Sequence, residues 1–239
     1  MQELTVGAPP PGMALHSNLA QVLMQIDAAA RKAGREPASV RLVAVSKTKP
    51  ASLVDEAAAA GQSVFGENYV QEFTEKAAAV KSQVEWHFIG HLQSNKIKYI
   101  VGLVTMIHSV DRLSLAIEID RQWERINKVC DILIQVNVSG ETSKSGTTSE
   151  EALGLIRQVA LLKNVRICGL MTMPPFFDDP QAARPYFREL RLLAEQVASL
   201  AIPNVSMREL SMGMSGDFEV AIAEGATLVR IGSALFGAR

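Results

Sequence analysis

The chain has 239 residues, 48% of them hydrophobic, and its 24 lysine and arginine residues nearly balance its 25 acidic residues. No basic run or stripe is present, so the composition argues against nucleic acid or an anionic membrane as a partner. No apolar run approaches the roughly 20 residues of a membrane span, and the start carries no signal-peptide pattern. We therefore expect a cytoplasmic protein with a disordered tail over residues 1–12 and a single folded domain over residues 13–239.

The first predicted element is an amphipathic helix. Apolar residues recur at helical spacing from Leu15 to Ala30, and Gly34 marks the end of the pattern. This helix precedes the first predicted strand.

Eight short apolar runs follow, and we predict each of them as a strand. They cover residues 42–45, 63–65, 85–89, 103–108, 132–138, 165–171, 206–212 and 227–231. Several of these runs are almost continuously apolar, which is typical of strands that are buried on both faces.

Amphipathic helices separate the strands. The first two are expected over residues 51–60 and 70–81. Asp111 is predicted to cap a helix with a buried stripe that ends at Ile126. A capping box formed by Thr148 and Glu151 starts the next helix.

The last long helix is expected to bury an apolar face that runs from Phe187 to Leu200. No helix is expected after the eighth strand, because only residues 232–239 follow it. The N-terminal helix is available to fill that place in the outer ring.

Eight strands that alternate with helices indicate parallel β/α architecture. A closed (β/α)8 TIM barrel with an extra N-terminal helix fits this number of units better than an open sheet does. The alternative, a doubly wound sheet, lacks the GxGxxG motif after its first strand that dinucleotide binding would require.

Lys47 lies at the C-terminal end of the first predicted strand, followed by Pro50 at the start of a helix. A lysine in such a place is costly to desolvate while charged, so it pairs with an acid, loses its proton or forms a covalent adduct. The alternative is a lysine that extends its ammonium group to the rim. In a barrel, the C-terminal ends of the strands carry the functional residues, which places Lys47 at that face.

Two loops at the C-terminal end of the chain predict a phosphate site. Ser211 to Asp217 follows the seventh strand, and Gly232 with Ser233 follows the eighth. The loops after these two strands are the usual phosphate site of this architecture, where backbone N–H groups and small residues favour an anion. Alternatively, Ser215 only caps a helix and Gly232 only forms a turn.

A lysine opposite a phosphate site suits a ligand that carries both an aldehyde and a phosphate. Pyridoxal 5′-phosphate (PLP) has this geometry, and a Schiff base on Lys47 removes the cost of a buried ammonium group. Arg230 would face the pyridine nitrogen, and its permanent charge would disfavour protonation of the ring. A phosphate-binding barrel with Schiff-base aldolase chemistry is a weaker alternative.

Six motifs in order resemble one family, the pyridoxal phosphate homeostasis proteins. They are LVAVSKTKP around Lys47, FGENYVQE at 65–72, WHFIGHLQSNK at 86–96, GLMTM at 169–173, LSMGMSGDFEVAI at 210–222 and VRIGSALFGAR at 229–239. The resemblance extends from about Leu15 to Arg239. It implies a barrel similar to the N-terminal domain of fold-type III PLP enzymes such as alanine racemase.

The resemblance also implies roles for individual residues. Lys47 would carry PLP as a Schiff base, Arg230 would face the ring nitrogen and Asn68 would line the pocket. The phosphate would be held by Ser211, Met212, Ser215, Gly232 and Ser233. Members of the family are thought to buffer PLP or to deliver it, with PLP-dependent apo-enzymes as possible recipients, and so to serve vitamin B6 homeostasis.

Catalytic turnover is not expected. Fold-type III racemases use a tyrosine from a second, β-rich domain as the opposing acid/base, and only eight residues follow Ile231 here. His91 is the best remaining acid/base candidate, and both His91 and Glu67 have structural alternatives. A racemase-like enzyme of weak activity is the alternative reading of the chain.

The remaining candidate ligands are expected in the core. His87 and His108 lie in apolar strands, and Cys130 and Cys168 adjoin apolar runs without CxxC spacing. No metal-ligand spacing and no GxSxG nucleophile motif is present. With no exposed apolar stripe in the pattern, we expect a monomer.

Overall fold

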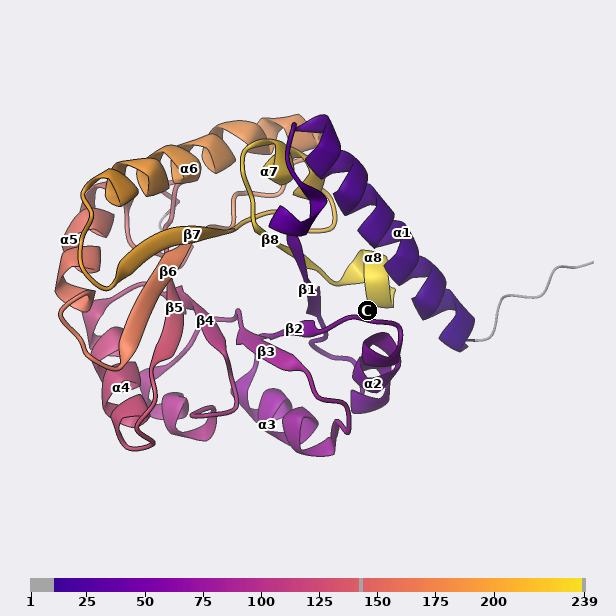
Figure 1. Ribbon diagram of the computed structural model, residues 1–239, viewed down its shortest axis with the longest axis horizontal. Coiled ribbons are helices and arrows are strands. Elements are labelled where there is room, and N and C mark those ends of the chain that lie inside the picture. The colour runs from indigo at the N-terminus through magenta and orange to yellow at the C-terminus, as the bar shows by residue number, and fades with distance from the viewer. Residues whose placement is uncertain (1–10, 142–143, 238–239) are drawn as a thin grey trace, which may run out of the picture.

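Eight parallel strands close into a barrel in sequence order from β1 to β8 (Figure 1). The computed structural model describes residues 11–141 and 144–237. Each strand pairs with the next, and β8 pairs back with β1 in a register that sets Leu42 opposite Val229. The predicted (β/α)8 barrel is therefore confirmed.

The strands are short, and their bounds lie close to the predicted runs. They are β1 (Arg41–Val45), β2 (Val64–Glu67), β3 (Glu85–Phe88), β4 (Met106–Val110), β5 (Cys130–Gln135), β6 (Val165–Met171), β7 (Val205–Ser211) and β8 (Leu228–Ile231).

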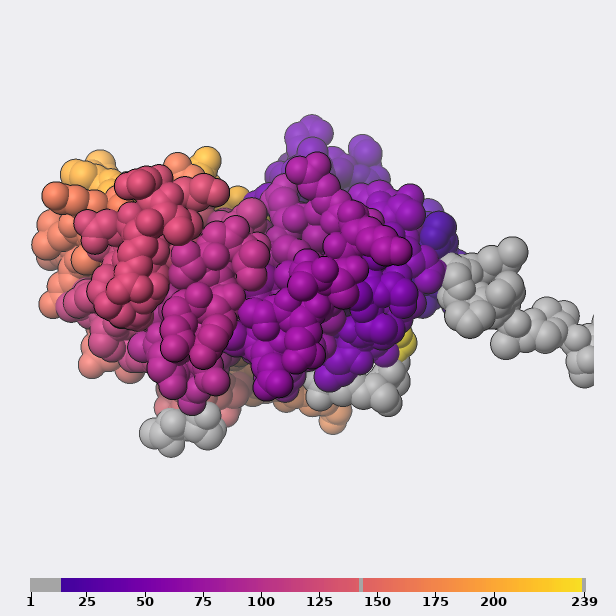
Figure 2. Space-filling model, turned by 90° about the horizontal axis from the view of Figure 1, so that it is seen from below, coloured from indigo at the N-terminus to yellow at the C-terminus, as the bar shows by residue number. Residues whose placement is uncertain are grey.

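Helices surround the barrel on all sides (Figure 1). They are α1 (Pro11–Lys32), α2 (Ala51–Ala59), α3 (Val70–Ala79), α4 (Leu113–Glu124), α5 (Ser149–Val159), α6 (Arg184–Ser199), α7 (Phe218–Ala223) and α8 (Ser233–Phe236), with short 3₁₀ segments at Pro37–Ser39, Ser94–Tyr99 and Pro180–Ala183. Seen from the side of α3 and α4, side chains of the N-terminal half form one continuous surface (Figure 2).

Strand alternation divides the core into two parts. Successive side chains of a strand point to opposite faces, so every second residue enters the barrel. The apolar residues inside are Val43, Val64, Met106, Leu133, Cys168, Met171 and Leu228. Their neighbours, such as Leu42 and Ala44, belong to the larger core between the strands and the helices.

The N-terminal helix packs beside the last two helices, as the sequence allowed. α1 lies along α7 and α8 on the outside of the barrel (Figure 1). Asn18 donates a hydrogen bond to the carbonyl of Leu235 in α8, 3.1 Å away. Arg35, just after α1, donates to the carbonyl of Ile222 in α7 at 2.9 Å. These bonds fix α1 over the place where the barrel closes.

The structure corrects four details of the predicted helices. The buried stripe of α4 ends at Trp123, because Ile126 lies beyond the helix and is 37% exposed. A short helix, α8, does follow the eighth strand. The residue that caps α4 is Arg112, with no side-chain cap, because the Asp111 carboxylate accepts a hydrogen bond from Arg112 instead. Leu200 is 43% exposed, since α6 ends one residue before it.

The other helix signals are confirmed. The Thr148 side chain accepts a hydrogen bond from the N–H of Glu151 and caps α5. α1 begins at Pro11, so the expected boundary of the tail falls in its first turn; residues 1–10 lie outside the described residues. No helix among the described residues is long and apolar enough to cross a bilayer.

Candidate functional site

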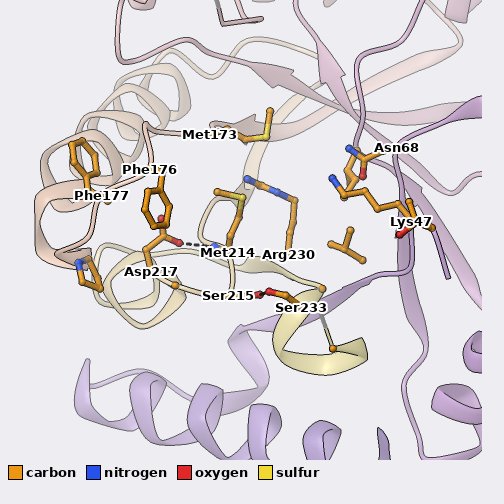
Figure 3. Close-up of a pocket in the computed structure, with 18 of the residues that line it drawn as sticks. Lys47, Asn68, Met173, Phe176, Phe177, Met214, Ser215, Asp217, Arg230 and Ser233 are labelled. Carbon is orange, nitrogen blue, oxygen red and sulfur yellow. Dashed lines mark hydrogen bonds between the residues drawn. The ribbon is translucent and has the colours of Figure 1, made fainter. Parts of the chain in front are cut away.

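A cavity of about 370 Å³ opens at the C-terminal ends of the strands. Its walls come from the loops after β1, β2, β3, β6, β7 and β8. Six of the residues predicted for the site line it: Lys47, Asn68, Ser215, Arg230, Gly232 and Ser233 (Figure 3).

Lys47 reaches the cavity because the alternation of β1 continues past its end. Val43 lies inside the barrel, and Val45 and Lys47 line the cavity. Ser46, between them, is buried and points outward, where it contacts Glu67 of β2. The Lys47 side chain is half-buried, which satisfies the expectation of a lysine at the functional face.

Asn68 lies on the same side of the cavity as Lys47 (Figure 3). Its Oδ1 atom is buried and has no hydrogen-bond partner among the described residues. An unsatisfied buried amide oxygen costs free energy, so a ligand with a polar group here would remove that cost. This orphaned atom is an observation that fits a bound polar cofactor.

The Asn68 backbone packs directly against Gly90. A Cβ added at Gly90 would lie 2.2 Å from the Asn68 carbonyl oxygen, which is too close for any side chain. We expect Gly90→Ala to push Asn68 out of place, to lower the free energy of unfolding by about 1–3 kcal/mol and to weaken ligand binding. Chemical unfolding and a PLP titration would check this. Gly154→Ala is the control, because a Cβ there meets nothing within 4 Å.

The loops after β7 and β8 meet on the opposite side of the cavity. The Ser233 hydroxyl donates to the Ser215 hydroxyl at 3.1 Å and joins the two loops (Figure 3). Among the described residues, the backbone N–H groups of Ser215, Gly216 and Ser233 donate to no backbone oxygen. Side-chain hydroxyls and free N–H groups together are the donors that a phosphate requires.

Two glycines shape these loops, one beside open space and one against β1. A Cβ added at Gly216 would meet nothing within 4 Å, so the backbone there faces open space. A Cβ at Gly232 would lie 3.2 Å from the carbonyl oxygen of Val45, so the loop after β8 packs tightly on β1. The donor set and the space therefore fit a phosphate group.

Several residues of the cavity wall were not predicted. Asp217 shapes the loop after β7, since its carboxylate accepts the N–H of Met214 at 2.6 Å, and burial raises its pKa. Met173, Phe176 and Phe177 form an apolar wall after β6 (Figure 3). Two prolines and two phenylalanines in a row at 174–177 were the available signal for this wall.

Arg230 lies on the floor of the cavity and is almost completely buried. It donates to the Ser211 hydroxyl at 2.6 Å and to the carbonyl of Thr172 at 2.9 Å. Burial lowers its pKa to about 10, so the guanidinium stays charged at neutral pH. Hydrogen bonds from two strands thus hold a cation in a fixed position under the cavity.

The hydrogen bonds continue from Arg230 into the barrel. Ser211 Oγ lies 2.9 Å from His108 Nδ1, and His108 Nε2 lies 3.0 Å from His87 Nδ1. Arg230 can only donate, so Ser211 accepts from it; the hydroxyl and the two imidazoles can each both donate and accept, and they continue the chain to His87. Burial lowers the pKa of both histidines, so both are neutral at neutral pH. The expectation that His87 and His108 are satisfied core residues is confirmed.

Two predicted phosphate ligands are not at the cavity. Ser211 is buried inside the barrel on Arg230 and His108, and Met212 is buried in the outer core. The N–H of Met212 donates to the carbonyl of Leu228. Ser211 ends β7 and Met212 follows it; alternation points Ser211 into the barrel below Arg230 and Met212 outward, so neither side chain reaches the cavity.

The other candidates have structural places. His91 is exposed and does not line the cavity, and Glu67 is buried against Lys76, outside the barrel. Cys130 and Cys168 are free and buried, and burial raises the pKa of both thiols. Within residues 11–141 and 144–237, no group of histidine, cysteine and acidic side chains could hold a metal ion.

Comparisons with known proteins identify the family of the chain. The family described as alanine racemase, N-terminal domain, matches residues 17–239. A pyridoxal phosphate homeostasis protein of Aquifex aeolicus is 48% identical over 222 residues, which covers 92% of this chain and 96% of its own. The protein of that name from Escherichia coli K12 is 44% identical over 226 residues, or 93% of this chain and 95% of its own.

A solved structure with the cofactor is also similar. PipY of Synechococcus elongatus PCC7942, with PLP bound, is 36% identical with a TM-score of 0.82, and the match covers 93% of this chain and 100% of that chain. The barrel and the family match define the class: the chain belongs to the alanine racemase N-terminal domain family. Within that class it is a member of the pyridoxal phosphate homeostasis proteins.

Proposed function

We propose that the chain binds PLP as a Schiff base on Lys47 and takes part in PLP homeostasis, by buffering or delivering the cofactor. The observation that carries the proposal is a half-buried lysine that shares one cavity with free backbone donors and a fixed arginine. PLP supplies an electrophilic aldehyde at this site. The PLP-bound PipY structure supports the same cofactor here.

Each cavity residue has a role in this proposal. Lys47 attaches the aldehyde carbon, and Asn68 meets a polar group of the ring. Ser215, Gly232 and Ser233 hold the phosphate through hydroxyl and backbone donors. Arg230 faces the ring nitrogen and keeps it unprotonated, which makes the bound ring a poor electron sink.

We infer that the protein does not turn over amino acids. Two-base racemisation requires a proton donor on each face of the substrate, and the described residues that line the cavity include no histidine and no tyrosine. The protein would act as a monomer in the cytoplasm and would release PLP to apo-enzymes that need it. The racemase alternative predicts exchange of an amino-acid α-proton in deuterated water, and we expect none.

Borohydride trapping tests the proposal. Apo-protein is mixed with PLP, the absorbance spectrum is recorded, and the mixture is reduced with borohydride and mapped by peptide mass. We expect one pyridoxyl group on Lys47, none on the neighbouring cavity lysine Lys49, and complete loss in Lys47→Ala. Lys98→Ala, an exposed lysine outside the cavity, is the control. No adduct on Lys47 at excess PLP would overturn the proposal.

A further inference from the structure

Lys47 lies in a strained turn. The N–H of Lys49 donates to the carbonyl of Ser46 at 3.0 Å, which closes a β-turn with Lys47 and Thr48 at its centre. Thr48 has a φ of +64°, in the left-handed region where a β-branched residue is an outlier. A turn of this kind normally places glycine at that position. Other contacts must therefore hold the turn that carries Lys47.

A buried cluster of charges lies directly behind this turn. The ammonium group of Lys76 donates to Glu67 Oε1 at 2.5 Å, to Glu72 Oε1 at 2.8 Å and to the carbonyl of Ser46 at 2.7 Å. These bonds use all three protons of the ammonium group. The side chains of Glu67 and Lys76 are 0% and 4% exposed, and that of Glu72 is 27% exposed.

Each member of the cluster bonds to the turn. Glu67 accepts the Ser46 hydroxyl at 2.7 Å, Lys76 donates to the Ser46 carbonyl, and Glu72 accepts the N–H of Thr48 at 2.5 Å. The last bond is the informative one, because the N–H of the third residue of a β-turn has no partner within the turn. Glu72 supplies that partner at the strained residue.

The cluster comes from two neighbouring elements, the end of β2 and helix α3. Glu67 ends β2 and alternation points it outward, toward α3. Glu72 and Lys76 are four residues apart on α3, with the acid on the N-terminal side, which is the favourable order for such a pair. Asn68, the other cavity residue on this side, directly follows Glu67. One cluster thus adjoins both Lys47 and Asn68.

We infer that Glu67, Glu72 and Lys76 are positioning residues that hold the Ser46–Lys49 turn in the conformation that presents Lys47 to the cofactor. This inference rests on the proposed function, since it concerns the reach of Lys47 toward a ligand aldehyde. Glu72 acts through the backbone of Thr48 and does not line the cavity.

Substitutions at Glu72 separate positioning from mere stability. Glu72→Ala removes the acceptor of the Thr48 N–H, whereas Glu72→Gln keeps an oxygen there. We expect Glu72→Ala to slow formation of the PLP adduct about tenfold and Glu72→Gln to slow it by less than about threefold. Stopped-flow absorbance gives the rate, and borohydride mapping assigns it to Lys47. Glu75→Ala, an exposed acid of the same helix, should match the unchanged protein.

A second substitution removes the strain itself. Glycine adopts a positive φ without cost, so Thr48→Gly in the Glu72→Ala background should restore at least half of the lost rate on a logarithmic scale. If Glu72 served only stability, Glu72→Ala would lower the unfolding midpoint and leave the rate of adduct formation unchanged. Thr48→Gly would then have no lost rate to restore.

The outcomes are distinct. An adduct on Lys47 in the unchanged protein, formed at the same rate in Glu72→Ala, would overturn the inference and leave the proposed function standing. The inference would also be overturned if Glu72→Ala formed the adduct slowly and the added Thr48→Gly substitution did not restore the rate. The absence of any Lys47 adduct in the unchanged protein would overturn the proposed function and the inference together.

Discussion

Replacing Lys76 with methionine is expected to lower the free energy of unfolding by about 3–5 kcal/mol. Methionine fills a similar volume but leaves the Glu67 carboxylate buried without its cation. Burial already raises the pKa of Glu67, and the hydrogen bond from Lys76 is the largest opposing influence. Glu67 Oε2 has no hydrogen-bond partner among the described residues, so without Lys76 the carboxylate would keep only the neutral Ser46 hydroxyl as a donor. Urea unfolding at neutral pH measures the loss.

A double substitution separates the lost charge pair from lost packing. Lys76→Met with Glu67→Gln removes both buried charges and keeps an oxygen for the Ser46 hydroxyl, so it should recover more than half of the loss. The control is Lys163→Met, an exposed lysine, which should stay within about 0.5 kcal/mol of the unchanged protein. A loss of less than about 1 kcal/mol in Lys76→Met would contradict the expected effect.

The barrel could be predicted because its evidence is repeated along the chain. Apolar runs of strand length alternate with amphipathic helices, and each run restates the same architecture. Lys47 and the loops at Ser215 and Ser233 could be predicted for the same reason, since topology alone brings the ends of parallel strands to one face. The lysine and the phosphate loops already suggested PLP, and the resemblance of the motifs implied the same ligand.

Two predicted site residues do not line the cavity, for a reason that sequence spacing does not show. Ser211 and Met212 lie in the same polar segment as Ser215, but they still belong to the sheet. The position at which β7 ends determines which side chains point into the barrel, which point outward and which belong to the loop. That end depends on pairing with β8, where Ser211 is opposite Leu228. A shift of one residue reverses every side chain, so the boundary had to be observed.

The charge cluster behind Lys47 was hidden for a related reason. Glu67 was identified only as an acid with two possible roles, and the sequence predicted no role for Lys76 beyond its place in the helix over residues 70–81. Their contact joins β2 to α3 and both to the turn after β1. Spacing within α3 predicts the Glu72–Lys76 pair, but it does not predict that the pair is buried on a strained turn.

His87 and His108 form a second set of buried titratable groups besides the cluster behind Lys47. From them we expect a strong effect of pH on the free energy of unfolding. Burial lowers the pKa of His87 to about 3, with Arg41 acting in the same direction and Asp131 opposing. Burial also lowers the pKa of His108, as do the neighbouring His87 and the charge of Arg230. Above a pH of about 6.5 both histidines are neutral in the folded and the unfolded chain. Below this pH, the two histidines bind protons in the unfolded chain but stay neutral in the folded chain.

The contribution of His87 to stability is therefore complete above about pH 6.5 and declines as the pH falls toward 3, by about 1.4 kcal/mol per pH unit. At pH 4.5 the loss is roughly 3 kcal/mol from this one side chain. Buried carboxyl groups with raised pKa values, such as Glu67 and Asp217, act in the opposite direction, because the folded chain takes up their protons first. A single pH profile mixes these effects, so the comparison of variants is decisive.

His87→Asn isolates the effect of this histidine. The amide group of the introduced side chain takes the place of Nδ1, offers His108 Nε2 either an oxygen acceptor or an N–H donor and takes up no proton, so the variant keeps the hydrogen bond and loses the titration. At pH 7 the variant is the less stable protein, because it leaves the rest of the imidazole volume empty.

Between pH 7 and pH 4.5 the gap in free energy of unfolding should close by about 3 kcal/mol or reverse. His91→Asn, at an exposed histidine, should run parallel to the unchanged protein over this range. Parallel profiles for His87→Asn would mean that the buried histidines take up protons in the folded barrel, next to Arg230.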